Sequence, residues 1–249
     1  MPRPEPLVLL HGWGMHPGFL APLGATLPER AVAALALPGH GPRAAEPVQD
    51  GAGAALLSNW AQDAAAQAPR GADWLGWSLG GMVALAVAAA APDAVRRLVL
   101  VASNPRFVSA DDWPHAVAPA VLEAFAAELA QDHRATLLRF LALQARGARA
   151  DVRDLRVALD AAPTPAPGAL RAGLSILRGA DLRGLLPRVR QPVLLIGGER
   201  DTLAPPAALE AVAAALPDAR LRLLRGAGHA PFVSNPEQVS AWIREFLDE

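Results

Sequence analysis

The stretch Leu75-Gly76-Trp77-Ser78-Leu79-Gly80-Gly81 decides the fold, because it places a serine between glycines where an apolar run gives way to a helical one. Residues 72–77 are apolar apart from Asp73, and residues 79–91 are almost all good helix formers. This order predicts a strand, a sharp turn and a helix. A serine at such a turn has a strained backbone and a hydroxyl that stands clear of the sheet. Taken alone, the pattern also fits an ordinary strand-to-helix turn.

Strand-like apolar runs alternate with helical runs on both sides of this stretch. The runs that favour strands are residues 7–10, 31–37, 75–77, 98–102, 193–196 and 221–224. Strands that are apolar on both faces and separated by helices indicate a parallel sheet covered on both sides. From about residue 113 to residue 186 the pattern is helical, with a proline-rich break at residues 163–167. The sequence therefore predicts a doubly wound α/β core formed by residues 1–110 and 187–249, with residues 111–186 inserted as a helical lid.

The composition limits the classes of function. A chain of 249 residues suits one large α/β domain that carries an insertion. There are no cysteines and the histidines have no metal-ligand spacing, so neither a metal nor a cofactor is expected. The net charge of −1 argues against nucleic acid or a membrane surface as partners. Because the sequence has neither a signal-peptide pattern nor an apolar run of about 20 residues, we expect a cytoplasmic protein. We also expect it to be a monomer.

Ser78 needs a base, because a serine hydroxyl is a poor nucleophile at neutral pH. His229 lies in the loop after the strand at 221–224, and Asp201 lies in the loop after the strand at 193–196. Loops that leave the carboxyl ends of parallel strands meet at one edge of the sheet. Either residue alone also fits a polar group that caps a turn. Three such residues in the order Ser, Asp, His favour a catalytic triad.

Two backbone amides are candidates for an oxyanion hole. A helix that starts after Ser78 leaves the Leu79 N–H without an intrahelical acceptor, which provides one donor. The loop His11-Gly12-Trp13-Gly14 follows the first strand and is the natural source of the second donor, the Trp13 N–H. We expect His11 to hold this loop in shape and His40, in a tight turn, to be structural.

Positive charge is concentrated in the predicted insertion. All 23 basic residues are arginine, and six of them fall between positions 134 and 156 against two aspartates. The six are Arg134, Arg139, Arg146, Arg149, Arg153 and Arg156. This local excess fits either a solvated helix face or a surface for an acidic partner.

Taken together, the motifs resemble the α/β-hydrolase superfamily over nearly the whole chain. They are His11-Gly12-Trp13-Gly14, Pro38-Gly39-His40-Gly41, Gly76-Trp77-Ser78-Leu79-Gly80-Gly81, Gly198-Glu199-Arg200-Asp201 and Gly228-His229-Ala230-Pro231-Phe232. Within that superfamily the chain looks most like the carboxylesterases that act on pimeloyl-acyl-carrier-protein methyl ester in biotin synthesis. That closer likeness also includes Asp112-Trp113-Pro114 and residues 139–144.

The resemblance implies a serine esterase that works through an acyl-enzyme. It makes Ser78 the nucleophile, His229 the general base and then acid, and Asp201 the partner that orients His229. Trp13 and Leu79 would provide the oxyanion N–H groups. The substrate-binding residues that it implies are Trp13, Phe140, Leu141, Leu143 and Gln144. The arginines that it implies for binding acyl-carrier protein are Arg134, Arg139, Arg149, Arg153 and Arg156, since arginine suits carboxylate and phosphate groups.

The chain departs from the family at its start, because members usually have a β-hairpin before the first motif and only six residues precede Leu7 here. We therefore expect the sheet to lack those edge strands. Two other functions stay open. One is a general carboxylesterase or thioesterase for short or medium acyl chains, with the arginines incidental. The other is a receptor that keeps the fold and binds ligand without turnover.

Overall fold

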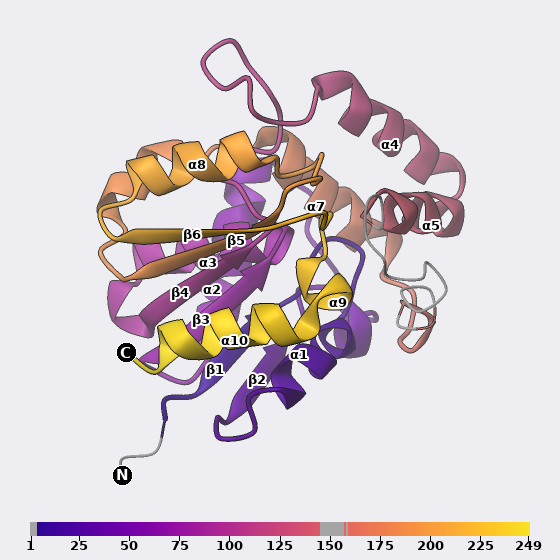
Figure 1. The fold of residues 1–249 in the computed structure, drawn as a ribbon. Helices are drawn as coiled ribbons and strands as arrows, with labels where there is room; N and C mark the ends of the chain where they lie inside the picture. Colours follow the sequence, from indigo (N-terminus) through magenta and orange to yellow (C-terminus); the bar gives the residue numbers. More distant parts are fainter. Residues whose placement is uncertain (1–3, 145–156, 158) are drawn as a thin grey trace.

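The computed structural model describes residues 4–144, 157 and 159–249, and a six-stranded sheet lies at its centre (Figure 1). The strands are β1 (Leu7–Leu10), β2 (Val32–Leu35), β3 (Ala72–Trp77), β4 (Val95–Val101), β5 (Val193–Gly198) and β6 (Ala219–Leu224). Their order is β2-β1-β3-β4-β5-β6, and every neighbouring pair is parallel. The predicted parallel sheet is confirmed. Within the described residues, β2 is an edge strand with no hairpin beyond it.

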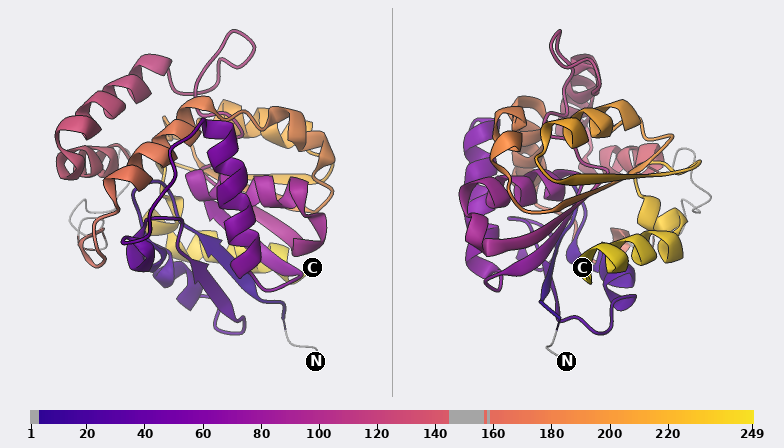
Figure 2. Two further views of the ribbon diagram at one scale, coloured as in Figure 1. Left: turned by 180° about the vertical axis from the view of Figure 1, so that it is seen from behind. Right: turned by 60° about the vertical axis from the view of Figure 1, so that its left-hand side comes forward.

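Helices cover both faces of the sheet (Figures 1 and 2). One face packs against α2 (Gly53–Gln67), α3 (Leu79–Ala90) and α8 (Pro206–Ala215), and the other against α1 (Ala21–Ala25), α9 (Pro231–Ser234) and α10 (Pro236–Leu247). Among the described residues there are also four 3-10 helices, η1 (Pro17–Phe19), η2 (Gly41–Arg43), η3 (Pro92–Ala94) and η4 (Arg183–Arg188). In the part of the chain that the structure describes, no helix is long and apolar enough to cross a membrane.

In the described part of the segment between β4 and β5, the α-helices are α4 (Pro119–Gln131), α5 (His133–Gln144) and α7 (Pro167–Gly179). Helix was expected from about residue 113, and this was wrong for residues 113–118. They belong to an irregular loop with isolated bridges between Val108 and Val117 and between Ala110 and Trp113. Pro114 and Pro119 explain the late start, because the residue before a proline disfavours helical backbone. The proposed boundaries of the insertion, 111 and 186, stay a prediction.

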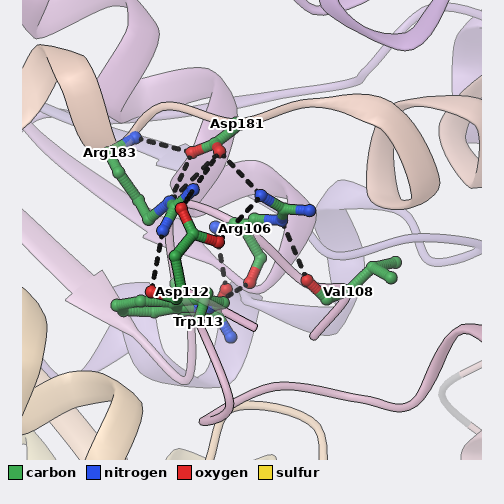
Figure 3. Close-up of polar contacts among 7 residues, drawn as sticks. Arg106, Val108, Asp112, Trp113, Asp181 and Arg183 are labelled. Atoms are coloured by element: carbon green, nitrogen blue, oxygen red, sulfur yellow. Dashed lines mark hydrogen bonds and ion pairs between the residues drawn. The ribbon is translucent and has the colours of Figure 1, made fainter. Parts of the chain in front are cut away.

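An ion cluster ties together the two ends of this inserted segment (Figure 3). Arg106 and Asp112 follow β4, whereas Asp181 and Arg183 follow α7. Arg183 contacts Asp181 at 2.7 Å and Asp112 at 2.9 Å, and Arg106 contacts Asp181 at 3.1 Å. The Arg183 guanidinium also lies over the Trp113 ring, 5.5 Å from its centroid. A single surface ion pair contributes little to folding stability. Here several ion pairs share partners, and together with the contact to Trp113 they fix where the segment leaves and rejoins the sheet.

A second ion cluster is buried and involves Asp73, the one charged residue of β3. Its carboxylate accepts hydrogen bonds from Arg30 at 2.8 Å and from Arg96 at 2.5 Å, and its side chain is 0% exposed. Arg30 also donates to the Leu247 carbonyl at 3.1 Å, beside the end of α10. The cluster therefore joins β3, the loop before β2 and the C-terminal helix.

We predict that Asp73→Ala lowers the free energy of unfolding by about 3–5 kcal/mol, because it leaves two guanidinium groups without their shared buried partner. Urea denaturation measures this. Glu46→Ala is the matched control, since Glu46 pairs with Arg43 but is about half exposed, and its loss should cost less than about 1 kcal/mol. Equal effects of the two substitutions would contradict the role given to Asp73.

Candidate active site

Ser78 lies between β3 and α3 in a strained conformation, with φ 56° and ψ −121°. The flanking glycines make this turn possible. A Cβ on Gly76 would lie 2.4 Å from the Gly80 carbonyl oxygen, and one on Gly80 would lie 2.4 Å from the Leu10 carbonyl oxygen. Because backbone atoms fill both spaces, any side chain would push α3 away from β3 and β1. The expected strand, turn and helix are confirmed.

The structure brings His229 and Asp201 together with Ser78. Ser78 Oγ is 2.9 Å from His229 Nε2, and His229 Nδ1 is 2.8 Å from Asp201 Oδ2. Asp201 Oδ1 accepts the N–H groups of Leu203 and Ala204 at 2.8 and 3.0 Å. With the Nδ1 proton directed at Asp201, Nε2 is left to accept the Ser78 proton. This arrangement is able to activate a serine hydroxyl.

The loops that carry Asp201 and His229 are tied to each other. A Cβ on Gly198, the last residue of β5, would lie 2.3 Å from the Gly228 carbonyl oxygen, so the two backbones are in direct contact. Arg200 N–H donates to the Ala227 carbonyl at 2.9 Å. Trp77 also fixes the loop that carries His229, because its indole N–H donates to the His229 carbonyl at 2.9 Å. The carboxylate and imidazole are therefore held on rigid supports.

Both candidate oxyanion donors are available. The N–H groups of Trp13 and Leu79 have no hydrogen-bond acceptor among the residues that the structure describes. Leu79 is the first residue of α3, so its amide also lies at the positive end of a helix. The Trp13 side chain is fixed separately, because its indole N–H donates to the Leu170 carbonyl of α7 at 2.9 Å.

The inserted helices cover this site. Phe140 of α5 meets the Trp13 ring edge to face, with centroids 4.9 Å apart, and Leu137 lies against Gly14. Leu141, expected to bind the substrate, is fully buried. Ser78 and His229 are each only 2% exposed, so both residues lie beneath the surface of the protein. The side chains of Leu143 and Gln144, also expected there, lie outside what the structure describes.

Sequence reasoning missed the contact of α7 with the two residues that carry the candidate oxyanion donors. A Cβ on Gly173 would lie 2.6 Å from Trp13 Cδ1 and 3.2 Å from Leu79 Cδ2, so α7 approaches both candidate donor residues. The sequence did contain a signal for this contact. Gly173 lies inside a helical run, where glycine lowers helix stability, and such a glycine often has a packing reason.

Two of the arginines expected to bind a partner are already paired within the chain. Arg134 lies 3.0 Å from Asp160, and Arg139 pairs with Glu128 of α4. All four side chains are partly or well exposed. Arg149, Arg153 and Arg156 fall outside the described residues. In the described part of the chain, no group of three or more His, Cys, Asp or Glu side chains is arranged to hold a metal ion.

Two buried histidines, His11 and His40, lie in and beside the loop at residues 11–14. His11 accepts the Leu37 N–H on Nε2 at 3.1 Å, and its Nδ1 lies 2.9 Å from the Gly12 carbonyl. The His40 ring lies 5.3 Å from that of His11, and its Nδ1 lies 2.9 Å from the Pro38 carbonyl. Burial is the main cause that lowers the pKa of both rings, and for His40 the pKa falls to about 4. Both are therefore neutral at pH 7, which agrees with a structural role.

Comparisons with known proteins identify the fold and close relatives. A family model described as "alpha/beta hydrolase fold" matches residues 5–236. The chain is 46% identical to a pimeloyl-[acyl-carrier protein] methyl ester esterase of Xanthomonas oryzae pv. oryzae (strain MAFF 311018), covering 97% of this chain and 94% of that protein. It is 43% identical to the protein of that name from Stenotrophomonas maltophilia (strain K279a), covering 98% and 93%.

Solved structures show the same architecture. An esterase from Exiguobacterium antarcticum superposes with a TM-score of 0.86 at 19% identity, covering 100% of this chain and 94% of that one. A hydrolase from Pseudomonas aeruginosa PA01 superposes with a TM-score of 0.80 at 27% identity, covering 98% and 91%.

We predict that His40 makes the protein sensitive to acid. Between pH 6.5 and about 4 the unfolded chain binds a proton at this residue that the folded protein does not. Stability from this group is therefore full above pH 6.5 and is lost as the pH falls toward 4, by an amount of ~3 kcal/mol. The substitution His40→Asn keeps a donor for the Pro38 carbonyl but cannot titrate. Denaturation at pH 7, 5 and 4 should show a shallower loss for His40→Asn, whereas parallel pH profiles would contradict this role.

Proposed function

The chain belongs to the α/β-hydrolase fold family, and we propose that this carboxylic ester hydrolase removes the methyl ester from a pimeloyl chain carried by acyl-carrier protein, a step of biotin synthesis. The observation that carries the proposal is the continuous hydrogen-bonded line from Ser78 Oγ through His229 to Asp201, with separations of 2.9 and 2.8 Å. The choice of substrate is supported by the name of the relatives, which are 43–46% identical to this chain. A cytoplasmic location and a monomeric state stay predictions.

In the proposed mechanism, Ser78 Oγ attacks the ester carbonyl carbon and passes its proton to His229 Nε2. The carbonyl oxygen becomes an oxyanion between the N–H groups of Trp13 and Leu79, and Asp201 stabilises the imidazolium that has formed. When the tetrahedral intermediate collapses, the carbon–methoxy bond breaks and His229 gives its proton to the departing oxygen, which releases methanol.

Water completes the cycle. It attacks the acyl-enzyme carbonyl carbon while His229 Nε2 takes one of its protons. When the second tetrahedral intermediate collapses, the bond between the carbonyl carbon and Ser78 Oγ breaks and His229 returns the proton to Ser78 Oγ. The product is a free carboxylate on the chain that is still carried by its partner. No cofactor enters any of these steps, since the proton and the electron pairs stay among Ser78, His229, water and the ester.

We further propose that the helices between β4 and β5 act as a lid that admits the acyl chain. Support comes from the contact of Phe140 with Trp13 and from the 2% exposure of Ser78. Phe140 and Leu137, which contact Trp13 and Gly14 from this side, are apolar, and this suits an aliphatic chain. In this scheme the exposed lid arginines, Arg139 among them, meet the acidic carrier protein.

A general carboxylesterase is the second candidate, and one observation favours it. Arg134 and Arg139 already have acidic partners, Asp160 and Glu128, so these guanidinium groups do not require an external anion. In that case the arginines would stabilise the inserted helices and the enzyme would accept free esters as well as carried ones.

We predict that Ser78→Ala lowers methanol release from carrier-bound methyl pimelate by a factor on the order of 10⁶. The loss follows because no other group in the site replaces the attacking oxygen. Methanol is measured by a coupled oxidase assay, and thermal denaturation serves as the control for folding. Substantial release by folded Ser78→Ala protein would exclude the serine mechanism.

We predict that Arg139→Ala raises the KM for the carrier-bound ester by about tenfold and leaves turnover of free methyl pimelate unchanged. The reason is that the guanidinium contacts the carrier and not the reacting ester. Arg190→Ala removes an exposed arginine that follows η4 and is the matched control. If Arg139→Ala changes neither substrate, the general esterase is the better description.

A further inference from the structure

The carbonyl of Ser78 accepts a hydrogen bond that the strand, turn and helix do not require. Ser103, which follows β4, donates to it from Oγ at 2.7 Å. Gly81 and Met82 also donate to this carbonyl, at 2.9 and 3.3 Å, but those bonds belong to the first turn of α3. Ser103 is only 2% exposed, so its hydroxyl is committed to the protein. The nucleophile's own carbonyl is therefore held from a neighbouring strand.

The backbone that delivers Ser103 is itself strained. Ala102 has φ 46°, and among the described residues Ser78 is the other non-glycine with positive φ. The N–H of Ala102 still donates to the Ile196 carbonyl at 2.8 Å, which anchors the end of β4 on β5 before the chain reverses. A left-handed alanine costs free energy and persists only where surrounding contacts hold it. The strained turns that follow two adjacent strands are thus joined by the hydroxyl of Ser103, the residue next to Ala102.

Gly81 leaves the space that Ser103 occupies. A Cβ on Gly81 would lie 2.5 Å from both the Cβ and the Oγ of Ser103. The sharp turn itself needs the glycines at 76 and 80, whose missing side chains make way for backbone. The further glycine at 81 has a different reason, which is to admit the Ser103 side chain under the start of α3.

The hydrogen bond from Ser103 matters because its acceptor is the carbonyl of the Ser78–Leu79 peptide. The carbonyl of Ser78 and the N–H of Leu79 belong to the same planar unit, so fixing the oxygen fixes the direction of the N–H. A donor to the carbonyl also polarises the peptide and strengthens the N–H as a donor. We propose that Ser103 is a positioning residue for the oxyanion hole, which holds and polarises the Ser78–Leu79 peptide so that its N–H meets the developing oxyanion. This rests on the proposed function, since the oxyanion forms only if Ser78 attacks an ester.

The test is Ser103→Ala, with rates expressed per Ser78 that a fluorophosphonate labels at completion, so that unfolded protein does not count. Turnover of carrier-bound methyl pimelate should show kcat lowered by about tenfold with KM within twofold, because the lost interaction acts in the transition state. A trifluoromethyl ketone with a pimeloyl-like chain forms a tetrahedral oxyanion on Ser78, and its inhibition constant should rise by the same factor. The corresponding secondary alcohol forms no oxyanion and should bind as before.

Ser240→Ala is the matched control, because Ser240 is also buried and donates to a backbone carbonyl, that of Pro236 in α10, at 2.6 Å. It should leave both the kcat and the ketone affinity unchanged. Equal ketone affinity in Ser103→Ala and wild-type protein, or an equal loss for ketone and alcohol, would overturn the proposal. Wild-type protein that neither labels nor releases methanol would instead refute the proposed function.

Discussion

The strained turn at Ser78 is the constraint on which the rest of the site depends. Its φ of 56° is compatible with the fold because Gly76 and Gly80 lack side chains, which lets β1, β3 and α3 approach one another closely around the turn. The same turn sets the serine hydroxyl toward His229 and leaves the Leu79 amide at the start of a helix. The proposed nucleophile and the proposed oxyanion donor therefore come from adjoining residues of one backbone segment, which follows a strand, β3, that is buried along its whole length.

Much of this arrangement could be predicted from sequence because it follows from local rules. Apolar runs separated by helices predict parallel strands, and residues just past the carboxyl ends of such strands meet at one edge. Ser78, Asp201 and His229 obey this rule, so their proximity follows without any knowledge of long-range packing. Their placement alone does not establish their catalytic roles, which belong to the proposed mechanism.

The contacts that sequence could not predict are those between distant segments. The irregular loop before α4, the approach of Gly173 to Trp13 and the pairing of Arg139 with Glu128 all depend on how the inserted helices pack. Nor does any local pattern mark Ser103, since its role arises from a bend at Ala102. The hydrophobic periodicity of the sequence thus predicts most of the fold. The packing of the inserted helices and the hydrogen bond from Ser103 depend on contacts between distant segments, which periodicity does not reveal.

The most direct test of the account is rapid-quench mass spectrometry of the protein during its first turnover of carrier-bound methyl pimelate. We expect a transient acyl adduct on the peptide that contains Ser78, and a burst of methanol equal to the amount of adduct. If water attacked the ester directly, methanol would appear without a burst and Ser78 would carry no adduct at any time. That result would contradict the central claim that this serine, activated by His229 and Asp201, is the nucleophile.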